Sequence, residues 1–125
     1  MGPAWALGPM LDPDHIWRTA EAKAEGLKDP LRYGRKTKLQ TGFSFKTAMD
    51  TIVKQLHDIE FPFFVLHGTA DKTIPLVASE KLILKAKSQE KKLNKYEGAC
   101  HDLLHDPDTK QVLGDILEWV ENKFQ

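Results

Sequence analysis

The sequence predicts an α/β fold in which two parallel strands are joined and flanked by helices. Residues 61–66 and 91–96 have strand character, and a glycine turn follows each of them. Helix signals fill the segment between these strands and the segment after them, so the order strand, helix, strand, helix indicates one βαβ unit. The 125 residues are 41% hydrophobic and 29% charged, as in an ordinary small globular domain.

The first half of the chain, residues 1–60, is predicted to be helical and loop-like. Asp12 and Pro13 are a typical helix start, and we expect that helix to run to about Ala24, with Gly26 as its stop. Residues 32–40 are basic and show no periodicity, which predicts a surface loop.

The clearest amphipathic helix is predicted over residues 44–57. Its apolar side chains recur with a helical period and form one face, so this face needs a partner surface. The residues of this face are Phe45, Ala48, Met49, Ile52, Val53 and Leu56.

The second half of the chain supplies the two strands and two further helices. The first strand is a continuous apolar run with Pro62 at its entrance, as in strands that are buried on both faces. A helix is predicted from Pro75 to about Lys87, and a last helix follows Asp106 and Pro107. We expect this last helix to turn five apolar side chains inward: Leu113, Ile116, Leu117, Val120 and Phe124.

Gly114 lies inside the last predicted helix. A glycine at such a position costs about 1 kcal/mol relative to alanine. We therefore expect a packing reason for it.

Two parallel strands do not make a stable sheet by themselves. One edge is left unpaired and is a candidate surface for self-association. The order of elements therefore predicts that the chain is part of a larger unit or depends on a partner.

Bulk charge excludes some classes of partner. Eighteen basic and 18 acidic residues give a formal net charge of +0, so no global field attracts nucleic acid or an anionic membrane. The basic cluster at Arg32, Arg35, Lys36 and Lys38 has little aromatic interleaving, and no nucleic-acid partner is expected.

No apolar run approaches the ~20 residues of a transmembrane helix. The single Cys100 suits a reducing compartment, and we expect a cytoplasmic or peripheral membrane location.

Asp71 and His101 are the candidate functional residues. Each lies a few residues beyond the end of a predicted strand, and the strands of a parallel sheet end at the same edge. If the two strands are neighbours, the two side chains meet. A carboxylate that accepts the Nδ1 proton of a histidine leaves Nε2 free as a general base.

Other interpretations of these residues stay open at this level. An aspartate after a strand is often only a turn former, and a histidine in a loop is often only a surface residue. A metal site from His67, Asp71, His101 and His105 lacks a recognised ligand spacing, so neither metal nor cofactor is expected. Cys100 beside His101 is more often a small packed residue than a nucleophile.

Two segments resemble a known family. Residues 59–71, Ile-Glu-Phe-Pro-Phe-Phe-Val-Leu-His-Gly-Thr-Ala-Asp, look like the acid-bearing strand and turn of α/β-hydrolases of the monoacylglycerol lipase type, with the serine aminopeptidase S33 domain. Residues 88–101, which end Tyr-Glu-Gly-Ala-Cys-His, resemble the strand and loop that deliver the family's histidine. Residues 29–33 and the basic stretch after them are similar to the end of the family's lid. Lysophospholipase-like and caffeoylshikimate esterase-like enzymes belong to the same group.

The resemblance implies the C-terminal portion of an α/β-hydrolase fold plus a helical lid remnant. Residues 1–40 would be the lid remnant, here named the lid segment, and residues 41–125 the C-terminal part of the core. By position Asp71 would be the triad acid and His101 the base of a serine hydrolase that cleaves carboxylic esters. The implied substrate of the complete enzyme is a small lipid ester, a monoacylglycerol or lysophospholipid. The lid segment is a candidate for peripheral membrane contact.

The sequence departs from this family in one important respect. The family's nucleophile lies in a Gly-x-Ser-x-Gly turn, whereas Ser44, Ser79 and Ser88 all lack that context. We therefore expect the chain alone to be inactive, and whether it acts as an enzyme stays open. The rival hypothesis is a non-catalytic lipid- or protein-binding module derived from the same fold.

Overall fold

The computed structural model describes residues 11–124. The longest connections between the described elements are residues 29–38, between the second and third helices, and residues 97–108, before the last helix. The elements are α1 (Pro13–Ile16), α2 (Ala20–Lys28), α3 (Leu39–Gln55), the 3-10 turn η1 (Leu56–Asp58), β1 (Phe63–Gly68), α4 (Leu76–Lys85), β2 (Lys91–Tyr96) and α5 (Thr109–Phe124).

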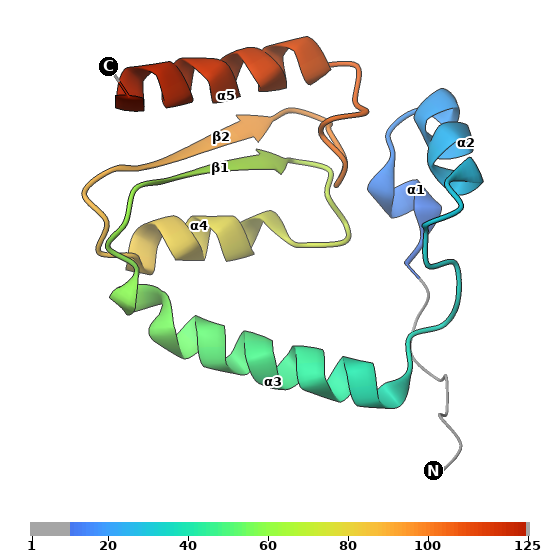
Figure 1. Cartoon of the computed structure of the whole chain (residues 1–125), viewed down its shortest axis with the longest axis horizontal. Helices are drawn as coiled ribbons and strands as arrows, with labels where there is room; N and C mark the ends of the chain where they lie inside the picture. Colours follow the sequence, from blue (N-terminus) through green and yellow to red (C-terminus); the bar gives the residue numbers. More distant parts are fainter. Residues whose placement is uncertain (1–10, 125) are drawn as a thin grey trace.

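The two strands form a parallel sheet, as predicted. The register pairs Phe63 with Lys91 at one end and Gly68 with Tyr96 at the other. Helix α4 covers one face of this sheet and α5 covers the opposite face (Figure 1), which gives three layers. Both strand arrows end on the side of the molecule where α1 and α2 lie (Figure 1).

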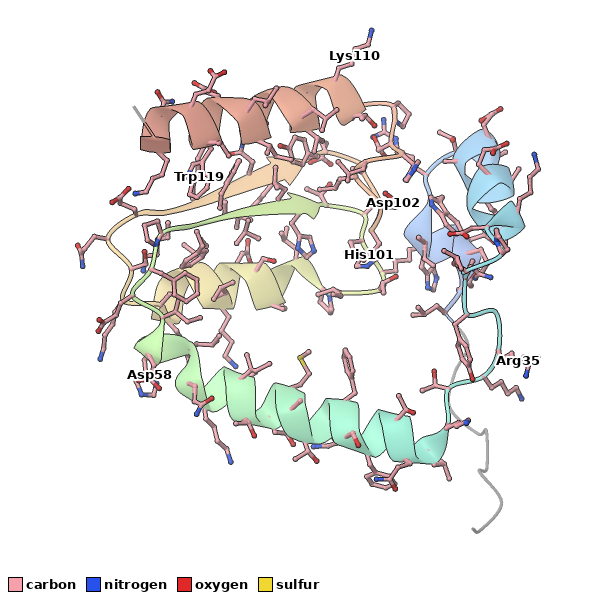
Figure 2. All side chains as sticks on the ribbon, in the orientation of Figure 1. Arg35, Asp58, His101, Asp102, Lys110 and Trp119 are labelled. Atoms are coloured by element: carbon pink, nitrogen blue, oxygen red, sulfur yellow. The ribbon has the colours of Figure 1, made fainter. Side chains whose placement is uncertain are left out.

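The core lies between the sheet and α5. Tyr96, Ala99 and Val112 are buried, and Leu66 packs against them. Further along the sheet the rings of Phe64 and Trp119 stack, with their centroids 5.9 Å apart, and Figure 2 shows Trp119 pointing from α5 to the strands. Alternation along β1 explains this arrangement, because Phe64 and Leu66 point to one face of the sheet.

The predicted first helix is divided into α1 and α2. Asp12 caps α1 by accepting from the Asp14 amide, and Thr19 caps α2 by accepting from the Ala22 amide. The predicted stop at Gly26 was wrong, because α2 continues to Lys28. A β-carbon at Gly26 would lie 2.0 Å from the Trp17 ring, so this glycine allows the close approach of α1 and α2.

Helix α3 begins earlier than predicted, at Leu39 instead of Ser44, and takes in the end of the predicted loop. None of its residues is buried, and only Leu56, in the turn after it, is covered. Its predicted apolar face is therefore present without a partner among the described residues. Phe45 is 64% exposed and Met49 44% exposed.

The predicted inward face of α5 was wrong at three positions. Leu113, Leu117 and Val120 are exposed. The side chains that contact the sheet are instead Val112 and Ile116, with Trp119 at the next helical position. The side chain of Phe124 lies outside the described part of the structure.

The predicted limits of the second strand, residues 91–96, are confirmed, whereas those of the first strand and of the helices differ by a few residues. Strand β1 begins at Phe63, after Pro62, which has no amide to donate to a ladder, and it continues through Gly68. No packing reason is found for Gly114, since a β-carbon there would meet nothing within 4 Å. None of the helices in residues 11–124 has the length and apolarity that crossing a bilayer requires.

Candidate active site

Asp71 and His101 meet at the tips of the two strands. Asp71 lies in the turn after β1 and His101 in the turn after β2. His101 Nδ1 is 2.8 Å from Asp71 Oδ2, which is a hydrogen-bond distance. The expected contact is therefore confirmed, while the catalytic role of either residue stays a prediction.

The Asp71 carboxylate has partners on both oxygens. Oδ1 accepts from the backbone amides of Thr73 at 2.7 Å and Ile74 at 2.9 Å, and Oδ2 accepts from His101. Burial opposes ionisation, but the Ile74 amide, the His101 ring and the Thr73 amide outweigh it and lower the pKa of Asp71 below its ordinary 3.8. Asp71 is thus an ionised acceptor at neutral pH, with a side chain only 5% exposed.

His101 is oriented for general base chemistry. An ionised Asp71 only accepts, so His101 Nδ1 carries the hydrogen between the two residues, and in the neutral ring Nε2 has a free lone pair. The His101 side chain is 38% exposed. In Figure 2 His101 lies at the strand tips, at the end of the sheet that is nearer to α1.

The two turns are held together by backbone hydrogen bonds. Thr69 N donates to Tyr96 O and Ala70 N donates to Ala99 O, both at 2.9 Å, and Gly98 N donates to Thr69 Oγ1. Gly68 permits this approach, because a β-carbon there would lie 2.2 Å from Ala99 O.

Gly98 takes a positive φ of 71°, which glycine adopts at little cost. It lies three residues before His101. The reversal that it makes after β2 leads the chain back toward the tip of β1.

A second histidine, His67, lies behind the pair and was not predicted as a site residue. Its Nε2 is 3.0 Å from Ile74 O and 3.7 Å from Asp71 Oδ2, and its Nδ1 is 2.7 Å from Ser79 Oγ. The sequence signal that could have identified His67 as a site residue is its position in the first strand, four residues before Asp71.

The lid segment is attached to the turn that carries His101. Asp102 Oδ2 is 2.9 Å from Trp17 Nε1 and 2.8 Å from His105 Nδ1, and the Asp102 amide donates to Ile16 O. Burial raises the pKa of Asp102, but hydrogen bonds from His105 and Trp17 outweigh burial and lower it. Figure 2 shows Asp102 beside His101 at this junction.

A pocket of about 650 Å³ lies on the lid side of this junction. Trp17, Arg32, Asp102 and His105 are among its lining residues, but neither Asp71 nor His101 is. This pocket is therefore adjacent to the pair and separate from it.

The other candidate nucleophiles and ligands are poorly placed. Burial, followed by the nearby carboxylates of Asp106 and Asp71, raises the pKa of the Cys100 thiol, which disfavours the thiolate. Ser79 and Ser88 are buried, at 9% and 3% exposure. Residues 11–124 hold no group of three side chains arranged to ligate a metal.

Comparison with known proteins defines the class. The family model described as "Serine aminopeptidase, S33" matches residues 1–108. A parallel sheet with helices on both faces and an acid–base pair at its strand tips are features of an α/β-hydrolase. The chain belongs to the serine aminopeptidase S33 family of α/β-hydrolases.

The relatives are lipases and esterases. The chain is 31% identical over 123 residues to the monoglyceride lipase of Homo sapiens, covering 97% of this chain and 40% of that protein. It is 32% identical over 100 residues to the caffeoylshikimate esterase of Arabidopsis thaliana, covering 78% of this chain and 30% of that protein. The chain thus spans less than half the length of these relatives.

Solved structures confirm the predicted fold class, a portion of an α/β-hydrolase. The crystal structure of Paleococcus ferrophilus monoacylglycerol lipase superposes with a TM-score of 0.81 at 30% identity, over 87% of this chain and 42% of that one. A monoglyceride lipase variant from Saccharomyces cerevisiae, solved with a substrate analogue, superposes with a TM-score of 0.80 at 21% identity.

Proposed function

We propose that this chain supplies the acid and the base of a serine hydrolase that cleaves lipid esters of the monoacylglycerol or lysophospholipid type. The observation that carries the proposal is the 2.8 Å contact between His101 Nδ1 and the doubly anchored carboxylate of Asp71. The names of the relatives support the monoacylglycerol part of this substrate class. The nucleophile is not among Ser44, Ser79 and Ser88, so it must come from protein outside these 125 residues.

In the proposed reaction Nε2 of His101 takes the proton of a serine hydroxyl as the oxygen attacks the ester carbonyl. Asp71 stabilises the imidazolium that forms and stays ionised. His101 then gives the proton to the departing alcohol, leaving an acyl-serine. Water repeats the sequence and releases the fatty acid.

A chimera tests this proposal directly. The aligned part of the Paleococcus ferrophilus monoacylglycerol lipase is replaced by this chain, and hydrolysis of a p-nitrophenyl ester is measured. We expect turnover, and we expect Asp71→Asn and His101→Ala each to reduce kcat by about 10⁴-fold.

His105→Ala in the same chimera is the matched control. His105 also donates Nδ1 to a carboxylate, that of Asp102, but it lies on the pocket side of the junction. The His105→Ala chimera should retain its turnover. Full activity in the Asp71→Asn or His101→Ala chimera, each with an unchanged circular dichroism spectrum, would contradict the assignment.

A second function, a non-catalytic binding module, is favoured by two observations. The apolar face of α3 is exposed, and the sequence has no Gly-x-Ser-x-Gly turn. A fluorophosphonate probe separates the two candidates when the chain is isolated from its native source. Labelling of a polypeptide that contains or tightly binds this chain supports the hydrolase, and absence of label supports the module.

We propose peripheral membrane contact through the lid segment. Leu31 is 91% exposed and Tyr33 63% exposed, and they lie on either side of Arg32, the first residue of the basic stretch. Flotation with phosphatidylcholine vesicles measures this contact. Binding that persists in a Leu31→Ser, Tyr33→Ser variant would place the contact elsewhere.

A further inference from the structure

His67 is a buried histidine whose two ring nitrogens are both engaged. It is 7% exposed and lies next to the last residue of β1, with its side chain toward α4. Nδ1 is 2.7 Å from the Ser79 hydroxyl, and Nε2 is 3.0 Å from the Ile74 carbonyl oxygen.

These two partners fix the tautomer of His67. A carbonyl oxygen only accepts, so His67 Nε2 carries a hydrogen and donates it to Ile74 O. Nδ1 of the neutral ring is then an acceptor, and the Ser79 hydroxyl donates to it.

This arrangement looks like a second serine–histidine–aspartate set, but its geometry does not suit catalysis. His67 Nε2 is 3.7 Å from Asp71 Oδ2, beyond hydrogen-bond reach, and its hydrogen is directed to Ile74 O. Ser79 is 9% exposed on the inner side of α4, where no ester carbonyl reaches its hydroxyl. The set is therefore a support for the turn after β1.

The support reaches Asp71 through one residue. The carbonyl oxygen of Ile74 is held by His67, and the amide of Ile74 donates to Asp71 Oδ1 at 2.9 Å. Fixing Ile74 also fixes the neighbouring amide of Thr73, which donates to the same oxygen at 2.7 Å. The remaining oxygen of Asp71 is then directed at His101.

We propose that His67 is a positioning residue of the acid–base pair. Held by the Ser79 hydroxyl, it clamps the 71–74 turn so that the carboxylate of Asp71 faces the imidazole of His101. The inference rests on the proposed function for its biological meaning, but its structural content concerns only residues of this chain. Measurements without turnover therefore test it separately from the proposed function.

Nuclear magnetic resonance of the full 125-residue chain tests the clamp. In the wild type we expect the ring nitrogen shifts of His67 to report the Nε2–H tautomer, and a Nδ1–H proton signal from His101. His67→Phe keeps ring volume but removes both hydrogen bonds. It should abolish the His101 signal and move the pKa of Asp71 up toward its ordinary 3.8. His67→Gln retains a donor and an acceptor and should restore both readouts.

Two serine variants test the same clamp with His67 unchanged, so the test does not depend on the folding of the histidine variants. Ser79→Ala removes the donor to His67 and should weaken the His101 signal. Ser88→Ala removes a comparably buried hydroxyl, bonded to Glu90 O instead, and should leave the signal unchanged. The Nδ1–H tautomer at His67, or an unchanged Asp71 titration in both His67→Phe and Ser79→Ala, would overturn the proposal.

Discussion

The ionised carboxyl group of Asp71 holds the turn after β1 and the turn after β2 in place, so its protonation affects stability. Its folded-state pKa is lower than its ordinary 3.8, so its stabilising contribution is fully present above pH 3.8 and is lost as the pH falls below that value. Each unit of pKa difference between the folded and unfolded states corresponds to about 1.4 kcal/mol.

Asp71→Asn should therefore flatten part of the acid limb of the stability curve. The asparagine cannot take up a proton, so the free energy of unfolding should fall less steeply below pH 3.8 than in the wild type. Asp102 keeps its own lowered pKa and leaves a residual slope. Urea unfolding at a series of pH values measures this, and identical slopes for the two proteins would exclude the assigned coupling.

Two glycine substitutions should change stability in opposite directions. Gly68→Ala places a β-carbon 2.2 Å from Ala99 O, and we expect a loss of roughly 1–3 kcal/mol because the backbone must move. Gly114→Ala meets no atom within 4 Å and lies inside α5, so it should stabilise by about 1 kcal/mol. Urea unfolding compares them, and equal effects would refute the packing difference.

At the scale of elements, Arg18 attaches the lid segment to the start of α5. Its guanidinium lies 3.3 Å from Asp106 and 3.1 Å from Asp108, and the Asp106 side chain is fully covered. Removing Arg18 leaves a buried carboxylate without its cation. A buried charge that loses its partner is strongly destabilising, although part of Arg18 is exposed to water.

Arg18→Ala should lower the free energy of unfolding by roughly 2–3 kcal/mol. The double variant Arg18→Ala, Asp106→Asn should recover part of that loss, since no unpaired charge remains. Thermal unfolding at neutral pH measures both. A double variant no more stable than Arg18→Ala would show that lost packing of the arginine stem dominates.

The sequence predicted the candidate site best where a local pattern of strand and turn decides the position of a side chain. The strand-turn pattern before Asp71 and before His101 predicted that the two side chains share one edge of a sheet, because parallel strands end together. Supporting contacts such as that of His67 with Ile74 depend on tertiary geometry. No spacing rule identifies them in advance.

The helices were predicted less well, for a physical reason. Periodicity locates an apolar stripe but does not say which stripe contacts the described sheet. In α5 the residues Val112 and Ile116 pack inward, while Leu113 and Leu117, one position further on, remain exposed. A helix that is apolar on two sides, as α5 is, can pack against two surfaces. One of these two surfaces is absent from residues 11–124.

At the scale of the whole molecule, the surface is too large for a self-contained domain. The accessible area is 9305 Å², whereas a compact monomer of 14.2 kDa exposes about 6,800 Å². Much of the exposed apolar area belongs to α3, which stands apart from the three-layer unit in Figure 1. Continuous apolar patches of this kind mark interaction surfaces.

The isolated chain should therefore bind an apolar dye such as ANS and associate with itself. Phe45→Glu with Met49→Glu should reduce both and change the free energy of unfolding by less than about 0.5 kcal/mol, since neither side chain is buried. Val112→Ala, at a site 1% exposed, is the contrasting control and should cost roughly 2 kcal/mol. A large loss of stability in the double variant would mean that α3 packs within the monomer.

The clamp, the carboxylate and the imidazole are all encoded between His67 and His101, inside one βαβ unit. The 30 residues that separate acid from base form a short loop by folding standards. Its closure costs on the order of 3 kcal/mol in chain entropy. In the proposed hydrolase, a single supersecondary motif thus pre-assembles the two residues that handle the proton, and selection could act on them separately from the residues that attack the substrate.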